Sequence, residues 1–439
     1  MNDRNQTVWG GRRGRGFVLQ ALILLLAGVV APASSQVQVN RYNVVKQEEG
    51  AYFTGAYPNL FGHLPGVTPD SVRLKIDRSF QQLFYGSDST ERIYYPVGTA
   101  MAYMLDVANK DVRTEGMSYG MMIAVQLNKR EEFDRLWLWA TTFMRFADGP
   151  HRGYFAWHCK ADGTRLDSTA ASDGEEWFVT ALLFASARWG DGTGIRAYRH
   201  EAVQILSTML HKEEEPDHGL VMNMFSRRDT LVAFVPSARA DHFTDPSYQL
   251  PHFYELWGRT AEKDNAFWCA AARASRRLLQ RSVHAETGLA PDYAGYDGKP
   301  FAFGGPGHAD FRFDAWRVAM NIAIDWTWFQ RDPWQVEQSN RLLHFFAGRG
   351  IRDYVNQYTL DGKPLGNDHS TGLVAMNAVA ALAATDPGRM SFVNELWTAG
   401  VPAGPYRYYD GVLYMLALLQ VSGNFRIYDP AGVPRPGCP

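Results

Sequence analysis

The sequence predicts an all-α fold of about a dozen helices in a single domain. Three observations indicate this fold class. Hydrophobic residues recur at helical spacing along most of the chain, strand-like runs are few and short, and no low-complexity linker or change of composition divides the 439 residues. The hydrophobic content of 46% and the charged content of 21% are typical of a globular protein that can bury a sizeable core.

The first 35 residues are expected to be a signal peptide and not part of the fold. A basic segment with Arg12, Arg13 and Arg15 precedes a continuous apolar run over residues 17–30, and Ala31-Pro32-Ala33 then supplies a small-residue cleavage pattern. Because the apolar run is shorter than the roughly 20 residues of a membrane span, cleavage is favoured over anchoring. We therefore expect export to a periplasm or the medium, a mature domain over residues 36–439, and no membrane association of the mature form.

In the first half of the chain, helical periodicity predicts helices over residues 71–85, 117–127, 131–147, 175–189 and 195–210. Turn signals such as Asp148-Gly149-Pro150 separate them. Ser172 and Glu175 have the spacing of a capping box at the start of the fourth helix. Two short strand-like runs follow, at residues 220–225 and 230–235.

In the second half, the same periodicity predicts helices over residues 246–260, 263–283, 314–330, 333–348, 371–384, 390–399 and 409–421. The segments 361–362 and 386–388, rich in Gly, Asp and Pro, carry turn signals between them. Helices therefore follow one another with short connections up to the C-terminus.

Acidic residues stand at the starts of three of these helices: Glu115, Asp173 and Asp314. Each acid alone could cap its helix or complement the positive end of the helix dipole. Successive helix starts marked by Glu115, Asp173, Tyr248, Asp314 and His369, however, fall 58, 75, 66 and about 55 residues apart, which is about the length of one helical hairpin each time. A ring of such hairpins would bring alternate helix starts to one end of a barrel. Inverting glycoside hydrolysis needs such a group, because one acid protonates the leaving oxygen and one carboxylate activates water.

Glu115 is the acid with the most informative surroundings. It lies where a polar segment with Arg113 gives way to an apolar helix, and Gly116 behind it would let the backbone or a ligand approach closely. A carboxyl group in apolar surroundings favours its neutral form, as a general acid requires near neutral pH.

Composition and motifs exclude other classes of function. The net charge of −2 argues against nucleic acid as the main partner, whereas 13 Trp, 21 Tyr and 25 Phe suit stacking against sugar rings. No HExxH motif or paired Cys/His spacing is present, so we expect no zinc site. The cysteines, Cys159, Cys269 and Cys438, allow at most one disulfide and leave open whether Cys159 and Cys269 meet.

Several segments in the right order resemble glycoside hydrolase family 8 over nearly all of the mature chain. They are DVRTEGMSYGMM with Glu115, ASDGEEWF with Asp173, FTDPSYQLPHFYELW with Tyr248, FRFDAWRVAMNI with Asp314 and Arg317, and YYDGVLYM near the end. The resemblance implies a single (α/α)6 barrel with an active-site cleft at one end, and residues 36–439 would be its catalytic domain. It also implies an inverting mechanism without a metal or an organic cofactor.

The resemblance further implies roles for individual residues. Glu115 resembles the general acid, Asp314 the general base, and Asp173 the acid that binds and distorts the sugar at the cleavage point. Asp310 lies only four residues before Asp314, but Asp314 is preferred as the base because Arg317 follows it in the DAWR pattern. The substrate-binding residues would be Tyr248 and Arg317, which help to hold the attacking water, together with Trp157, His369, Tyr408 and Tyr409.

Within the family, the chain looks most like the reducing-end xylose-releasing exo-oligoxylanases. In those enzymes a histidine-bearing loop closes the site beyond one sugar, and the segment Gly362–Ser370 with His369 takes that place here. Asp368 and Ser370 differ from the Leu and Pro found in one form of that loop. The alternatives are an endo-β-1,4-xylanase, another β-1,4-glucanase of the family or, from another class, a non-catalytic glycan-binding protein. We expect a monomer that acts on xylo-oligosaccharides or xylan.

Overall fold

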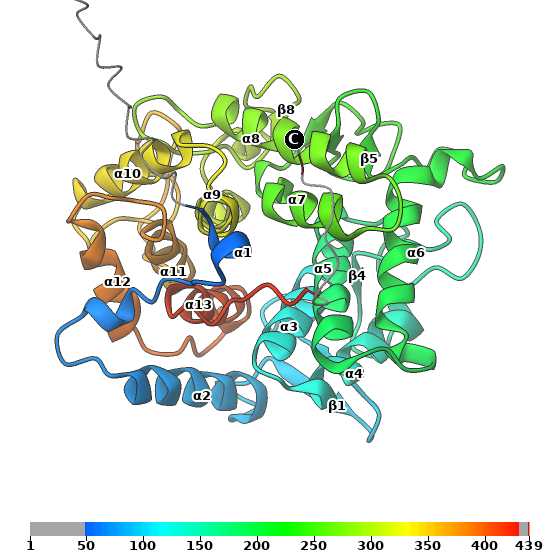
Figure 1. The fold of residues 1–439 in the computed structure, drawn as a ribbon, viewed down its shortest axis with the longest axis horizontal. Helices are drawn as coiled ribbons and strands as arrows, with labels where there is room; N and C mark the ends of the chain where they lie inside the picture. Colours follow the sequence, from blue (N-terminus) through cyan, green and yellow to red (C-terminus); the bar gives the residue numbers. More distant parts are fainter. Residues whose placement is uncertain (1–48, 430–437, 439) are drawn as a thin grey trace, which may run out of the picture. The chain divides into compact units, whose positions relative to one another are not determined.

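The computed structural model of the chain describes residues 49–429 and residue 438. The expected signal peptide, residues 1–35, therefore lies outside the described residues, as do residues 36–48 and 430–437 of the expected domain. The described part consists of two concentric rings of helices, which confirms the predicted all-α barrel (Figure 1). None of its helices is long and apolar enough to cross a membrane.

The inner ring consists of helices that are buried on nearly every side, because their sequences are apolar or small around most of the helix. Neighbours along the ring contact one another, and Trp257 Nε1 donates a hydrogen bond to Thr180 Oγ1 at 3.1 Å between α5 and α7. These helices are α3 Thr114–Gln126, α5 Ser172–Trp189, α7 Pro251–Thr260, α9 Trp316–Phe329, α11 Thr371–Ala380 and α13 Arg407–Val421.

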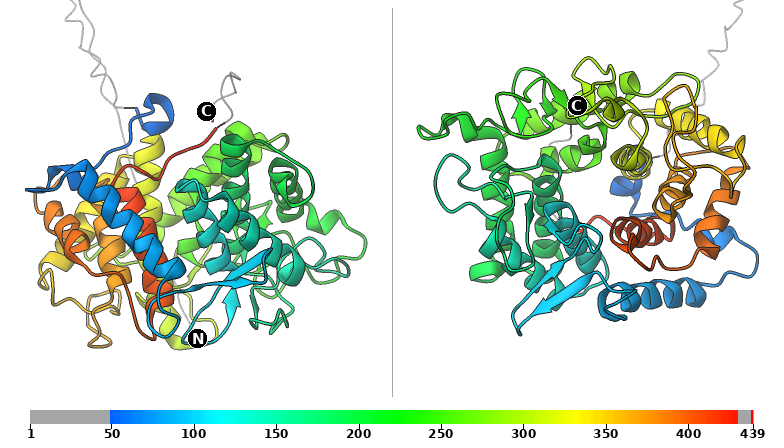
Figure 2. Two further views of the ribbon diagram at one scale, coloured as in Figure 1. Left: turned by 90° about the horizontal axis from the view of Figure 1, so that it is seen from below. Right: turned by 180° about the vertical axis from the view of Figure 1, so that it is seen from behind.

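The outer ring consists of amphipathic helices that bury one face against the inner ring and expose the other. They are α2 Pro69–Tyr85, α4 Arg130–Trp139, α6 Tyr198–His211, α8 Asn265–Ser282, α10 Trp334–Ala347 and α12 Arg389–Thr398. A single turn, α1 Ala51–Thr54, packs on α9, and a π-helical turn, η2 Ala140–Met144, continues α4. Inner and outer helices alternate along the chain, and the two further views in Figure 2 show the same arrangement.

The helix boundaries follow the predictions with two corrections. The predicted capping box is wrong, because Ser172 Oγ donates to Ala233 O at 2.8 Å and Glu175 Oε1 accepts the Phe155 N–H at 2.9 Å. Both side chains thus bind neighbouring segments rather than the helix start. The predicted helix over 246–260 is divided, since a 3₁₀ turn, η5 Pro246–Tyr248, precedes α7.

Short antiparallel ribbons lie in the connections between the helices. They pair β1 Tyr94–Val97 with β2 Met101–Met104, β3 Val112–Arg113 with β4 His158–Cys159, β5 Phe225–Ser226 with β6 Leu231–Val232, and β7 Phe243–Thr244 with β8 Ala294–Gly295. β6 falls in a predicted strand-like run, and β5 overlaps the end of the other at Phe225. The two-residue strands β3, β4, β7 and β8 carry no alternating pattern, and the four-residue strands β1 and β2 were not predicted. The remaining 3₁₀ turns are η1 Phe61–His63, η3 Gly194–Arg196, η4 Lys212–Glu214, η6 Pro306–Ala309 and η7 Phe313–Ala315.

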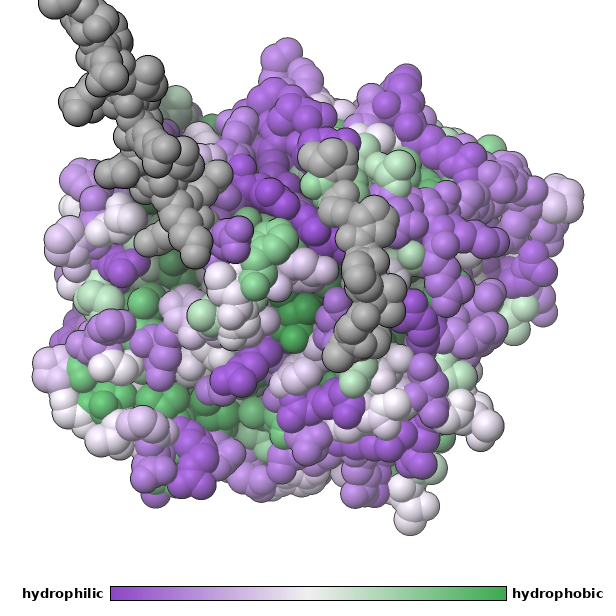
Figure 3. Space-filling model, viewed as in Figure 1, coloured by the Kyte–Doolittle hydropathy of each residue, from purple (hydrophilic) through white to green (hydrophobic). Residues whose placement is uncertain are grey.

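One large hydrophobic core fills the space between and inside the rings, and it contains most of the buried tryptophans. The face drawn in Figure 3 is largely hydrophilic, with smaller apolar areas. A disulfide joins Cys269 of α8 to Cys438, and Cys159 is a buried free cysteine. The open question about Cys159 and Cys269 is thus answered, because Cys269 pairs with a different partner.

Candidate active site

The candidate site lies at the end of the barrel where the inner helices begin. Glu115 is in the first turn of α3, Asp173 is in the first turn of α5, and Asp314 is in η7 directly before α9. The starts of alternate helices meet at this end, as predicted, so three acids from distant parts of the sequence face one another. The positive ends of the helix dipoles also point here, which favours negatively charged groups.

Arg317 is the side chain that joins these acids. Its guanidinium is buried, and Nη1 donates to Glu115 Oε2 at 3.1 Å and to Asp173 Oδ2 at 3.0 Å. Nη1 also lies 2.7 Å from Tyr119 Oη, and Nη2 donates to Asp314 Oδ1 at 2.8 Å. Arg317 therefore contacts all three acids, whereas the sequence assigned it to Asp314 alone. Glu115 and Asp314 bind different nitrogens of one guanidinium. Their carboxyl groups therefore lie in the same site, separated by the guanidinium group.

Burial sets the protonation of two of these acids. Burial raises the pKa of Glu115 to about 7, against the opposing charge of Arg317, and the carboxyl groups of Asp314 and Asp173 raise it further. The pKa of Asp173 rises to about 6, also chiefly through burial. Glu115 is therefore an acid that keeps its proton close to neutral pH, as a general acid must.

Two glycines allow the helix starts to approach closely. A Cβ on Gly116 would lie 2.3 Å from Tyr408 Oη, and a Cβ on Gly174 would lie 2.4 Å from Thr114 Cβ. Tyr408 can thus donate to Glu115 Oε1 at 3.3 Å. Tyr408 is only 2% exposed and is a hydrogen-bond partner of Glu115, and its role in binding substrate stays a prediction.

The other predicted aromatic residues lie around this centre. Tyr248 is 6% exposed, and its ring faces the Arg317 guanidinium at 5.7 Å. Tyr409 donates to Phe313 O at 2.9 Å, and its hydroxyl lies 3.5 Å from Asp314 Oδ1. Both tyrosines are therefore placed to orient groups at Asp314 rather than to offer a broad stacking face.

Trp157 flanks Glu115 through a backbone contact. Its carbonyl accepts the N–H of Thr114 at 2.9 Å, next to the ribbon that pairs Arg113 with His158. The indole is half-buried, and the His158 ring stacks on it at 3.6 Å with an interplanar angle of 7°. The remaining exposed part of Trp157 borders the site beside the candidate acid.

Asp310 does not join the acids around Arg317. Its side chain lies 3.7 Å from Arg312, and its carbonyl accepts the Asp292 N–H at 2.9 Å. The side chain in contact with Arg317 at this point of the chain is that of Asp314. The geometry therefore agrees with the choice of Asp314 over Asp310 as the candidate base.

The segment Gly362–Ser370 is fastened beside the base. Tyr358 forms isolated bridges with Phe311 on one side and Pro364 on the other, and Asn356 N donates to Asp368 O at 2.8 Å. His369 is exposed, and its Nδ1 lies 2.7 Å from Tyr354 O. Since a carbonyl only accepts, Nδ1 carries the proton in this contact.

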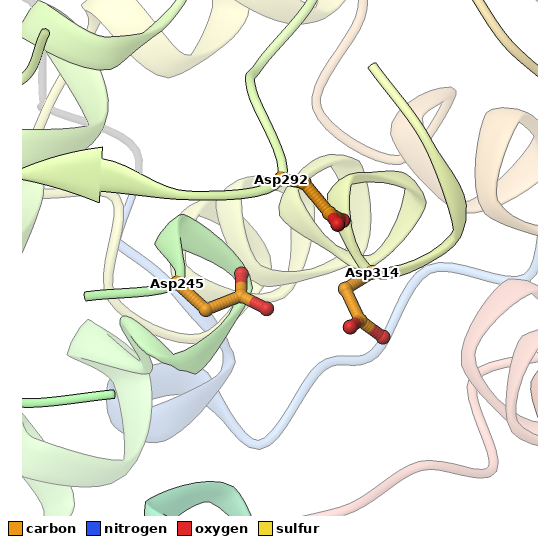
Figure 4. Close-up of side chains that lie close together, drawn as sticks. All are labelled: Asp245, Asp292 and Asp314. Carbon is orange, nitrogen blue, oxygen red and sulfur yellow. The ribbon is translucent and has the colours of Figure 1, made fainter. Parts of the chain in front are cut away.

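Sequence reasoning missed three residues of the site: Tyr119, Asp245 and Asp292. Tyr119 contacts Arg317 one turn after Glu115, a spacing that could have suggested it. Asp245 and Asp292 lie near Asp314 and point toward it (Figure 4). The ribbon of β7 and β8 brings them together, and strands this short gave no signal in the sequence.

Comparisons with known proteins agree with this arrangement. Residues 102–423 match the sequence model of glycosyl hydrolases family 8. The chain is 48% identical over 386 residues to the reducing-end xylose-releasing exo-oligoxylanase Rex8A of Paenibacillus barcinonensis, covering 87% of this chain and 99% of the relative. A structure of Rex8A with xylose superposes with a TM-score of 0.82 at 47% identity, covering 87% of this chain and all of the other. A xylohexaose complex of a catalytic mutant of a family 8 xylanase from Teredinibacter turnerae superposes at 0.83 with 43% identity, covering 87% of this chain and 100% of the other.

Proposed function

Because this chain belongs to glycosyl hydrolases family 8, we propose that it is a reducing-end xylose-releasing exo-oligoxylanase. It hydrolyses β-1,4-xylosidic bonds of xylo-oligosaccharides with inversion at the anomeric carbon, as members of this family do. The observation that carries the proposal is the pair Glu115 and Asp314, held on two nitrogens of one buried guanidinium at the end of the barrel.

Glu115 serves as the general acid in this proposal. With a pKa of about 7 it holds a proton at the pH where the leaving oxygen needs one. Asp314 is the general base, since Arg317 orients its carboxylate and its side chain remains 32% exposed to receive a water. Asp173, bound to the same guanidinium, holds the sugar at the cleavage point. The two carboxyl groups should be about 6.5–9.5 Å apart, which leaves room for the attacking water.

The exo mode follows from the segment Gly362–Ser370 beside Asp314. Its contacts with residues 354–358 hold it next to η7, and His369 Nε2 is available to accept a hydrogen bond. A free anomeric hydroxyl is the group that distinguishes a reducing-end sugar from the sugars within a chain. A site that satisfies this hydroxyl discriminates against chains that continue past it, because its polar group would then be left unpaired.

Xylotetraose labelled at its reducing end tests the proposal. The label should appear first in xylose and in no longer product, and proton NMR of the first product formed at the new reducing end should show the α-anomer. Early β-anomer would contradict inversion and the role of Asp314. Absence of any hydrolysis would favour a glycan-binding protein instead.

The similarity to the Teredinibacter turnerae xylanase supports a second candidate, an endo-β-1,4-xylanase. The residues on either side of His369, Asp368 and Ser370, are polar, and Asp368 is exposed, so the loop could leave the cleft open. Endo action would release labelled xylobiose and xylotriose early and would rapidly lower the viscosity of xylan.

The proposal also includes three properties of the mature protein. It is exported, it is a monomer, and it does not associate with a membrane. The basic and apolar N-terminal residues support export, and xylo-oligosaccharides arise outside the cell that degrades xylan. N-terminal sequencing of the secreted protein should give a start near residue 36, and light scattering should give the mass of one chain.

A further inference from the structure

Three aspartates direct carboxylate oxygens toward a common point beside the candidate base. One oxygen each from Asp245, Asp292 and Asp314 lies within 4.8 Å of the other two (Figure 4). The backbone fixes this convergence, because Thr244 pairs with Ala294 in the β7–β8 ribbon and Asp292 N donates to Asp310 O at 2.9 Å. The three residues, called the aspartate triad below, are therefore held in place by main-chain contacts.

Two oxygens of the aspartate triad are buried without a hydrogen-bond donor among the described residues. Asp245 is fully buried, and its Oδ1 accepts the Ser247 N–H at 2.7 Å while Oδ2 has no donor. Asp292 is 3% exposed, and its Oδ2 meets His308 Nδ1 at 2.6 Å while Oδ1 has no donor. A buried carboxylate oxygen without a partner is costly, so these atoms indicate a ligand that supplies positive charge.

The charges around the aspartate triad favour the same ligand. Arg317 is the buried guanidinium that the acids share, and it lies 4.0 Å from Asp245 Oδ2 but 2.8 Å from Asp314 Oδ1. It is also bound to acids outside the aspartate triad. Besides Glu115, which keeps its proton close to neutral pH, four carboxyl groups meet here, those of Asp173, Asp245, Asp292 and Asp314. They face Arg317 and, when it is protonated, His308 on Asp292, so the carboxyl groups outnumber the cations.

We propose that the aspartate triad binds a divalent cation of the Ca²⁺ type. Carboxylate oxygens are the ligands that hard cations prefer, whereas softer metals select nitrogen and sulfur. Ca²⁺ accepts six to eight oxygens at roughly 2.3–2.6 Å in flexible geometry, whereas Mg²⁺ demands a near-ideal octahedron, so three carboxylates and added water suit the Ca²⁺ type. Asp314 is 32% exposed in its side chain, so water can reach the ion and complete its coordination.

Such an ion would regulate the enzyme, and this consequence rests on the proposed function. A cation bound to Asp314 withdraws the lone pair that must accept a proton from water, and it occupies the position next to the base. Hydrolysis should therefore decrease as the aspartate triad fills, with a midpoint equal to the dissociation constant of the ion.

Terbium luminescence tests the site without reference to activity. Tb³⁺ replaces Ca²⁺ at oxygen sites and is excited through nearby aromatic rings. Tyr293 follows Asp292 in the sequence, and the charges of all three aspartates act on its hydroxyl group. In the full-length protein, emission should rise to saturation at one Tb³⁺ per chain, and Ca²⁺ should displace it. Asp292→Asn should weaken binding at least tenfold.

Two further variants make the test specific. Asp245→Asn can keep the bond to the Ser247 N–H, so it should fold and still weaken Tb³⁺ binding at least tenfold. Asp310→Asn removes an acid outside the aspartate triad and should bind Tb³⁺ as the wild type does. Equal binding by all variants, or no saturable binding, would overturn the site. If the triad variants lose binding but Ca²⁺ leaves xylotriose hydrolysis by the wild type unchanged, the cation site stands and the role of Asp314 as base fails.

Discussion

At the scale of single residues, Arg317 determines the electrostatics of the site. It is buried, and it binds Glu115, Asp173 and Asp314 through two nitrogens. Buried carboxylates need such a partner, since breaking a buried ion pair by removing one member typically costs about 3–5 kcal/mol. Burial raises the pKa of Glu115 to about 7 against the charge of this guanidinium, so Glu115 can keep its proton close to neutral pH.

The first prediction separates Asp314 from Asp310. Asp314→Asn should lower kcat by about 10²–10⁴ because the attacking water loses its base, whereas xylotriose should still bind measurably. Asp310→Asn should change kcat little, because its side chain faces Arg312. Steady-state kinetics and calorimetric binding measure both variants. If Asp310→Asn proved the inactive one, the base would be wrongly assigned.

The second prediction concerns pH. Glu115 acts in its protonated form and has a pKa of about 7, so kcat/KM for xylotriose should fall tenfold per pH unit above about 7. Measuring kcat/KM from pH 5 to 9 shows this decrease on the alkaline side. Glu115→Gln should be inactive on xylotriose but retain much activity on xylobiosyl fluoride, whose leaving group needs no proton. A profile flat up to pH 9 would exclude Glu115 as the acid.

At the scale of elements, connections between helices supply the specificity of the site. The ribbon of β3 and β4 places Trp157 beside Glu115, and the segment Gly362–Ser370 lies beside Asp314 through contacts with residues 354–358. The helices provide the frame, and the segments at their starts are the parts we expect to determine which sugars fit.

The third prediction tests the segment Gly362–Ser370. His369→Ala should reduce the release of labelled xylose from reducing-end-labelled xylotetraose and increase the share of labelled xylobiose, because the anomeric hydroxyl loses its acceptor. Chromatography of early products measures the ratio. Lys363→Ala, in the same segment with a side chain 79% exposed, should leave the ratio unchanged. An unchanged ratio in His369→Ala would mean that His369 does not set the cleavage position.

At the scale of the molecule, the two rings of helices share one hydrophobic core, and the disulfide ties Cys438 to an outer helix. The cross-link spans 169 residues of sequence. By limiting the unfolded chain, a disulfide typically stabilises the folded state by about 2–4 kcal/mol.

The fourth prediction concerns this cross-link. Cys438→Ser should lower the melting temperature, while kcat at 25 °C stays at the wild-type value because the bond lies in α8, an outer helix. Calorimetry measures the loss. Cys269→Ser should cause a similar loss, and the double variant should lose little more, since either change alone breaks the bond. Independent, additive losses would show that the thiols stabilise the fold by packing and not by their bond.

The sequence by itself determined the fold class and the order of the helices, and it pointed to Glu115, Asp173 and Asp314 at helix starts as candidate acids. These features are local, because helical periodicity and the residues at a helix start can be read within a few turns of chain. The choice of Asp314 over Asp310 also followed from a local pattern, since Arg317 lies one turn later.

Only the tertiary structure decided that Arg317 joins all three acids, that Tyr408 is buried against Glu115, and that Asp245 and Asp292 converge on Asp314. It also decided that Cys269 pairs with Cys438. Each of these contacts joins segments that are far apart in the chain or held by strands of two residues. Packing brings such segments together, and no periodic pattern in the sequence records which of them will meet.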